Sequence, residues 1–286
     1  LHLSIRRQRQ MCIRDRVIYG VVAGASIGQL FAAGFVPGLL MAVALMIMVA
    51  FYARRYKYPR DQAFRLSILG QAFLRAFLSL LTPVIIVGGI LSGAFTPTEA
   101  AIAACAWALI LGLFVYRTLT LRRFLKVSMD TIETTSVVLF IVAAASIFAW
   151  ILTSNRVPEH FASLILGVSE NPIIILLLIN VILLIVGCFM ETVAAITILV
   201  PVLLPIAVHI GIDPVHFGVI LVLNLMIGLL TPPVGMVLYV LSRVSKVPFE
   251  RCVSATAPFL IPLFAVLLLV TFFPIFTMWL PTLIYR

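Results

Sequence analysis

The chain has 286 residues, of which 63% are hydrophobic and only 10% are charged, and its mean hydropathy is +1.23. Soluble domains average roughly 45–50% apolar and about 25% charged residues, so this composition excludes a soluble globular protein and predicts an integral membrane protein. The formal net charge of +10 lies in short clusters between apolar segments, which is typical of loops at an anionic membrane surface and argues against nucleic-acid binding. The apolar runs lack the alternation of barrel strands, so we expect an all-α polytopic fold.

The cysteines and histidines do not show the spacing of a metal site. Cys12, Cys105, Cys188 and Cys252 form no CxxC pair, and the four histidines form no HExxH motif. We therefore expect no transition-metal site and no cofactor, and we interpret the cysteines as small apolar residues in helix packing.

The first sixteen residues differ from the rest of the chain. Residues 1–16 hold five arginines and one aspartate, and Met11–Arg16 resembles translated sequencing-adapter sequence. We expect residues 1–16 to be a non-native leader, with the native chain continuing upstream of Val17. The alternative is the basic region of a signal anchor, although the apolar run that follows offers no clear cleavage pattern.

The next region mixes crossings with an interfacial segment. Residues 17–34 are apolar and glycine-rich, which predicts a closely packed helix that ends in a bend. Residues 36–53 are long enough to cross, since about 20 apolar residues span the hydrocarbon core. In residues 58–81 arginines recur among large apolar side chains, which is typical of an amphipathic helix at the interface. Residues 83–94 form a short apolar stretch, and Thr96-Pro97-Thr98-Glu99 is a typical start for a helix through Tyr116. Whether one or two crossings lie here remains open.

A re-entrant hairpin is predicted at about 134–170. A long apolar arm (136–152) leads to a polar tip (153–160), and the return arm (161–168) is too short to cross the membrane. The alternative is an ordinary loop outside the membrane. A further apolar helix is expected from Ile173 to Met190.

Two apolar stretches would be transmembrane helices without their prolines, threonines and one carboxylate. We predict broken helices at about 187–205, where Glu191 precedes Pro201 and Pro205, and at about 228–242, around Thr231-Pro232-Pro233. An unpaired backbone carbonyl costs several kcal/mol in lipid, so such breaks persist only where they face protein or a wet cavity. Secondary transporters bind ions and substrates at such breaks.

The remaining elements complete the predicted architecture. Gly211–Pro214 predicts a turn with an aspartate cap, and residues 259–280 predict a last crossing. Weak internal similarity between the two ends of the chain suggests the end of one repeat followed by a whole second repeat. We therefore divide the chain into 17–126, the end of a first repeat with scaffold and interfacial helices, and 127–286, the second repeat with its hairpin and broken helices.

From Val17 to the C-terminus the chain resembles the large membrane subunit of TRAP (tripartite ATP-independent periplasmic) transporters, the DctM type. The resemblance rests on five segments in order: VIYGVVAGASIGQLF, ARRYKYP, GAFTPTEAA, METVAAITILVPVLLPIAVHIGIDPVHFG and NLMIGLLTPPVG. The last two are the most specific. Members of the family carry a further stretch before this region, with a first hairpin.

The resemblance implies an inverted-repeat, elevator-type secondary transporter and not an enzyme. It implies uptake of an organic acid, typically a carboxylate, across the bacterial inner membrane, with sodium as the coupling ion. The implied partners are a small four-helix membrane subunit of the DctQ type and a periplasmic substrate-binding protein of the DctP type.

Candidate site residues lie at the hairpin tip and at the two breaks. Arg156 presents a planar fork that matches a carboxylate, and in similar proteins an arginine at this place anchors the substrate's acid group; Ser154 and Asn155 are assigned to the same substrate site. Glu191 is a costly group inside a membrane and either shapes the substrate pocket or compensates sodium; alternatively it stabilises a helix N-terminus. The candidate sodium ligands supply hydroxyl or carbonyl oxygens: Thr192, Gly228, Thr231, Pro232 and Val234. The alternative for these residues is a proline kink with packed threonines, and Asn180 and Asn224 are interpreted as helix–helix hydrogen-bond partners.

Three other functions stay in competition. The first is an ion-coupled dicarboxylate symporter of related hairpin fold that works without a binding protein. The second is a polytopic membrane enzyme, against which the absence of HExxH and of paired intramembrane aspartates argues. The third is a structural membrane subunit without a site of its own.

Overall fold

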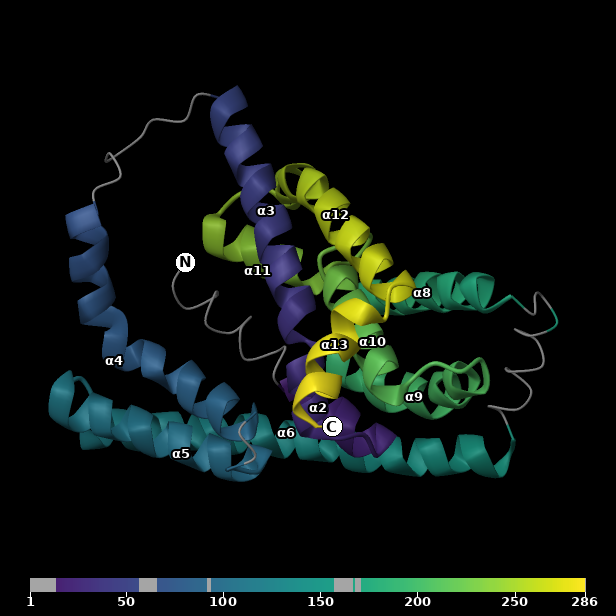
Figure 1. Ribbon diagram of the computed structural model, residues 1–286, viewed down its shortest axis with the longest axis horizontal. Coiled ribbons are helices and arrows are strands. Elements are labelled where there is room, and N and C mark those ends of the chain that lie inside the picture. Colours follow the sequence, from purple (N-terminus) through teal and green to yellow (C-terminus); the bar gives the residue numbers. More distant parts are fainter. Residues whose placement is uncertain (1–13, 57–65, 92–93, 157–166, 168–170, 286) are drawn as a thin grey trace. The chain divides into compact units, whose positions relative to one another are not determined.

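The computed structural model describes residues 14–56, 66–91, 94–156, 167 and 171–285, and these residues form helices joined by turns, without strands (Figure 1). Five helices in this described part are long and apolar enough to cross a membrane. They comprise Ile27–Arg55, Thr98–Val115, Pro172–Phe189, Thr192–His209 and Phe249–Phe272. The prediction of an all-α polytopic membrane fold is therefore confirmed.

The chain divides into two compact units. The small unit is Phe51–Val137, and the large unit combines Leu1–Ala50 with Val138–Arg286. Two helices, α3 (Phe35–Arg55) and α6 (Leu121–Ser154), each contribute residues to both units.

In the small unit, α4 (Leu66–Leu91) packs against α5 (Pro97–Ile110), which continues as the π-helical segment η1 (Leu111–Val115). The Trp107 indole N–H donates to the Leu78 carbonyl at 3.0 Å, and the hydroxyls of Ser79 and Tyr116 are also 3.0 Å apart. The expected separate stretch at 83–94 is wrong, because α4 continues through Pro83 as one helix. Neighbouring groups re-satisfy the backbone at such prolines in apolar helices.

The start of α5 is fixed by the predicted cap. Thr96 accepts a hydrogen bond from the Glu99 backbone at 3.4 Å, while the Glu99 carboxylate accepts one from the Thr96 backbone at 2.8 Å. This reciprocal capping box satisfies two amide groups that the helix cannot satisfy itself.

Loss of this cap gives the first prediction. We expect Thr96→Ala to lower the free energy of unfolding by about 1 kcal/mol, because the cap hydroxyl is then missing. Thr118→Ala is the matched control, since Thr118 is also an exposed threonine beside a helix but its hydroxyl makes no hydrogen bond within the described residues. Thermal unfolding of the purified protein compares the two, and equal melting temperatures would contradict the role assigned to the cap.

In the large unit, α10 is the central helix. It runs from Pro214 to Gly228 and packs against α2, α8, α9, α12 and α13 (Figure 1). Every residue from Val215 to Leu225 is buried, as expected for a helix that is apolar all round. The surrounding helices are α2 (Ile27–Ala33), α8 (Pro172–Phe189), α9 (Thr192–His209), α11 (Met236–Ser245), α12 (Phe249–Phe272) and α13 (Ile275–Ile284).

Several helices begin or end at residues other than those expected from the sequence. Pro201 and Pro205 lie inside a continuous α9, so the first break falls at Met190–Glu191 and not at the prolines. The expected single crossing at 259–280 is wrong, because the chain leaves the helix at Phe273 and Pro274, between α12 and α13. The helix α6 begins at Leu121, earlier than the expected residue 136. The return arm of the predicted hairpin (161–168) lies outside the described residues except for Gly167.

Candidate functional site

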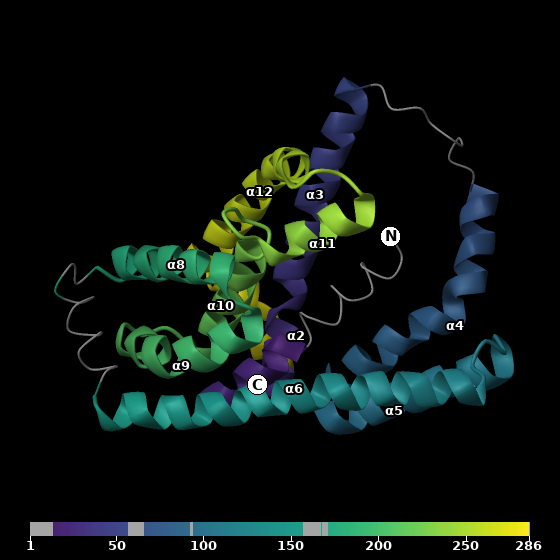
Figure 2. The ribbon, with the colours of Figure 1, turned by 180° about the vertical axis from the view of Figure 1, so that it is seen from behind.

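The two breaks in the large unit lie against each other. α8 ends beside the point where α10 gives way to α11, as both views show (Figures 1 and 2). A Cβ atom added to Gly228 would lie 2.8 Å from the Gly187 Cα and carbonyl carbon, so the two backbones are in direct contact. The Gly235 N–H donates to the Cys188 carbonyl at 3.3 Å. The last turn of α8 and the turn after α10 therefore form one structural element.

The turn after α10 presents oxygen atoms that no helix uses. Within the described residues, nothing donates a hydrogen bond to the carbonyls of Pro232 and Val234. Gly235 has φ 53°, a left-handed conformation that reverses the chain before α11. The Thr231 hydroxyl donates to the Ile227 carbonyl at 2.8 Å, which leaves its oxygen lone pairs free to face a cation. The Gly228 carbonyl accepts from the Thr231 amide at 2.9 Å and retains a second lone pair.

The break before α9 presents a helix N-terminus without a side-chain cap. Glu191 occupies the N-cap position, but its carboxylate does not accept from the first amides of the helix. Thr192 is 2% exposed, and no described residue forms a hydrogen bond with its hydroxyl. α11 likewise begins at Gly235 without a side-chain cap. Uncapped amides and the helix dipole together favour negative charge at such positions.

The Glu191 carboxylate faces a cation in this structure. The Arg14 guanidinium donates to Glu191 Oε1 at 2.7 Å and lies 3.6 Å from the Asp15 carboxylate. Asp15 is fully buried, and this burial raises the pKa of its carboxyl to about 6. Arg14 belongs to residues 1–16, which are expected to be a non-native leader, so this ion pair assigns no role to Glu191, whose role stays a prediction.

The predicted substrate ligands lie at the end of α6. Ser154, Asn155 and Arg156 are exposed, and Arg156 adopts φ 55°. The Asn155 side-chain amide donates to the Ile151 carbonyl at 2.8 Å. Among the described residues, no hydrogen bond or ion pair joins these three to the breaks, so their role in substrate binding stays a prediction.

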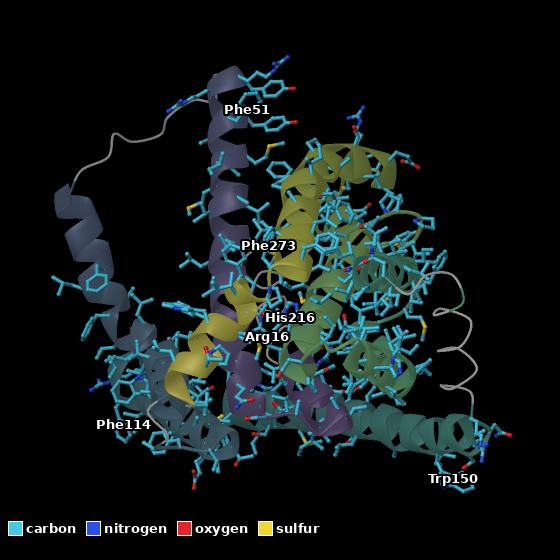
Figure 3. All side chains as sticks on the ribbon, turned by 45° about the vertical axis from the view of Figure 1, so that its right-hand side comes forward. Arg16, Phe51, Phe114, Trp150, His216 and Phe273 are labelled. Carbon is cyan, nitrogen blue, oxygen red and sulfur yellow. The ribbon has the colours of Figure 1, made fainter. Side chains whose placement is uncertain are left out.

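Among the described residues, buried polar side chains join several pairs of helices. Asn180 and Asn224 form the interhelical hydrogen bonds that the sequence predicted, at 2.7 and 2.9 Å. Another contact was not foreseen: His216, which Figure 3 labels, has its Nδ1 atom 2.6 Å from the Thr277 hydroxyl, between α10 and α13. The proximity of Gly187 to Gly228 was also missed, since an isolated glycine gives no signal of its partner.

The chain is similar to known proteins over most of its length. The sequence model of the family described as "Tripartite ATP-independent periplasmic transporter, DctM component" matches residues 14–276. The chain is 50% identical over 267 residues to the sialic acid TRAP transporter large permease protein SiaM of Vibrio cholerae, with 93% of this chain and 62% of that protein covered. It is 42% identical over 265 residues to the C4-dicarboxylate TRAP transporter large permease protein DctM of Pseudomonas aeruginosa, with the same coverage. The chain thus spans about three fifths of the length of these relatives.

Proposed function

This chain belongs to the DctM family of TRAP transporter large permeases, and we propose that it forms the substrate-translocating part of a secondary carrier for an organic acid. Members of the family are multi-pass proteins of the inner membrane, in agreement with the five apolar helices. Both relatives are named as permeases, which favours a transporter over an enzyme.

The contact between the two breaks carries this proposal. Unpaired carbonyls and uncapped amides are costly in a membrane, yet here they gather where the ends of α8 and α10 meet. A carrier needs this combination, because it must bind a cation and an anion close together and release both. A purely structural subunit would gain nothing from such a turn.

We assign sodium to the turn after α10. The carbonyls of Pro232 and Val234 offer hard oxygens without a full charge, as ion-selective sites require. The oxygens of Gly228 and Thr231 lie in the same turn, and Thr192 adds a buried hydroxyl from the facing break. These are the residues that the sequence predicted, and their role as ligands is part of the proposal.

We assign the acid group of the substrate to Arg156 with Ser154 and Asn155, aided by the uncapped start of α9. The names of the two relatives specify sialic acid and C4-dicarboxylates, which are both carboxylates. A carboxylate explains why a guanidinium and helix N-termini, rather than acidic side chains, would form the site. Glu191 then serves to balance positive charge beside the acid.

We propose the partners that the family description implies. It names a tripartite periplasmic system; a small four-helix membrane subunit and a periplasmic substrate-binding protein would complete the carrier. The competing symporter would work without a binding protein, so uptake in the absence of that protein distinguishes the two.

Uptake measurements test the proposal. The open reading frame that contains this chain, read through the codon for Val17 with long reads, is expressed with the transporter genes beside it and reconstituted in vesicles. We expect uptake of a labelled carboxylate to require an inward sodium gradient and the binding protein. Uptake driven equally well by potassium would contradict the assignment of sodium.

Thr231 gives a sharper test of the sodium site. We expect Thr231→Val to raise the half-saturating sodium concentration about tenfold, which corresponds to about 1.4 kcal/mol for one lost oxygen ligand. Thr256→Val is the matched control, because its hydroxyl donates to Cys252 in the same way, at the same 2.8 Å, and is also partly buried. An equal shift in both variants would show that only local helix packing had changed.

A further inference from the structure

The structure contains a buried hydrogen-bond bridge that the proposed site does not use. On α10, the Asn224 side-chain amide donates to the Asn180 side-chain oxygen at 2.7 Å and to the Asn180 backbone carbonyl at 2.9 Å. Asn224 is 0% exposed and Asn180 on α8 is 6% exposed. Both acceptors therefore belong to one residue of the facing helix.

The orientation of Asn224 is fixed by these contacts. Its NH₂ group faces two oxygens of Asn180, so a rotated amide would place oxygen against oxygen. Asn180 is itself held, because its NH₂ group donates to the Leu176 carbonyl at 2.8 Å and to the Thr271 hydroxyl at 3.4 Å. Asn224 Oδ1, in contrast, is buried without a partner among the described residues. An apolar side chain of similar size would fill the same space without this unpaired acceptor, so the amide needs a reason beyond packing.

The position of the bridge supplies that reason. Asn224 lies four residues before Gly228 on α10, one turn away on the same face, and Asn180 lies seven residues before Gly187 on α8, two turns away. The bridge and the Gly187–Gly228 contact thus lie in sequence along one crossing of two helices. The crossing ends at the hydrogen bond from Gly235 to Cys188, where the breaks meet.

We propose that Asn224 is a positioning residue, whose two hydrogen bonds to Asn180 hold α10 in register with α8 so that the oxygens of the two breaks face one sodium ion. Apolar contact between helices is non-directional, and the glycine contact limits mainly their separation. The bridge defines their position along the axis, since its bonds tolerate changes of only a few tenths of an ångström. This inference rests on the proposed function.

Isosteric replacement tests the bridge. Asn224→Leu keeps the number and branching of the non-hydrogen side-chain atoms and removes both donors, and we expect it to raise the half-saturating sodium concentration about tenfold while the maximal uptake rate at saturating sodium stays within twofold. Thr271→Val is the matched control. It removes the outer end of the same polar network, where the hydroxyl lies 3.4 Å from Asn180, but leaves the bridge between α8 and α10 intact. We expect its sodium dependence to stay within twofold of the wild type.

A double variant separates positioning from stability. In Asn180→Leu/Asn224→Leu the side-chain acceptor of the bridge is removed together with its donor, and the backbone carbonyl of residue 180 lies within helix α8, so the protein should recover most of the melting temperature that the single variant loses. We expect its sodium affinity to stay low, because no hydrogen bond sets the register. Wild-type sodium affinity in the double variant, or a change only in maximal rate or yield in the single variant, would overturn the proposal.

Uptake by the wild-type protein shows whether a failed test concerns the sodium assignment or the positioning role of Asn224. If wild-type uptake ignores sodium, then the assigned coupling ion is wrong and the positioning role falls with it. If wild-type uptake requires sodium and Asn224→Leu keeps the same affinity, then only the positioning role is wrong.

Discussion

Replacement of Arg156 by glutamine is expected to reduce uptake of the acid at least about a hundredfold. Arg156 is exposed here, so this effect requires that the bound acid excludes water from the guanidinium; loss of one partner from such a hydrogen-bonded charge pair costs about 2–5 kcal/mol, mostly because the other charge is left unpaired. Arg156→Lys keeps the charge but loses the planar fork, so we expect an intermediate loss. Initial rates of uptake in vesicles, measured over a range of substrate concentrations, give both effects.

The chain offers a close control for this arginine. Arg117 is also exposed and also adopts a left-handed backbone, with φ 48° compared with 55° for Arg156. Arg117→Gln should therefore cause the same backbone and surface changes without loss of uptake. If Arg156→Gln behaves like Arg117→Gln, the substrate role of Arg156 is wrong.

The second large effect is expected at the glycine contact. Gly228→Ala would place a methyl group 2.8 Å from the Gly187 backbone, and only separation of α8 and α10 relieves the clash. Overpacking of this kind typically costs about 1–3 kcal/mol, and we place this case at the upper end because backbone atoms cannot rotate away. Transport should fall with stability, since the same separation pulls the two breaks apart.

Alanine substitutions at three glycines test whether the loss of stability follows the distance between the added methyl group and its neighbours. Gly187→Ala meets its nearest atoms at 3.2 Å, in Leu225, so its effect should be smaller than that of Gly228→Ala. Gly38→Ala in α3 meets nothing within 4 Å and should be neutral or stabilising, because alanine favours helices. Melting temperatures of the purified variants in detergent should follow this order, and a destabilised Gly38→Ala would undermine the argument.

The sequence predicted most of this architecture for identifiable reasons. Apolar runs, the Thr96–Glu99 cap and the Asp213 turn are local signals, and the Asp213 carboxylate indeed accepts from the Val215 amide at 2.7 Å. The break at Glu191 was also predicted, although its prolines were misleading. Proline is a local signal for a break, but an apolar surrounding allows α9 to continue through Pro201 and Pro205.

The pairing of the breaks could not be predicted in this way. Gly187 and Gly228 are forty-one residues apart in the numbering and carry no side chain whose chemistry suggests a partner. The bond between Gly235 and Cys188 uses backbone atoms alone. Such contacts depend on how α8 and α10 cross, which is a property of the tertiary structure and not of either segment.

That backbone bond has a thermodynamic consequence. Because Gly235 donates to Cys188, neither break can rearrange without changing the environment of the other. In a carrier, bound substrate that orders the shared turn raises the affinity for sodium. By linkage, bound sodium must then raise the affinity for the substrate by the same factor. Reciprocity itself follows from thermodynamic linkage, and on the proposed function the hydrogen bond between the two helix ends is one contact through which the coupling free energy would act.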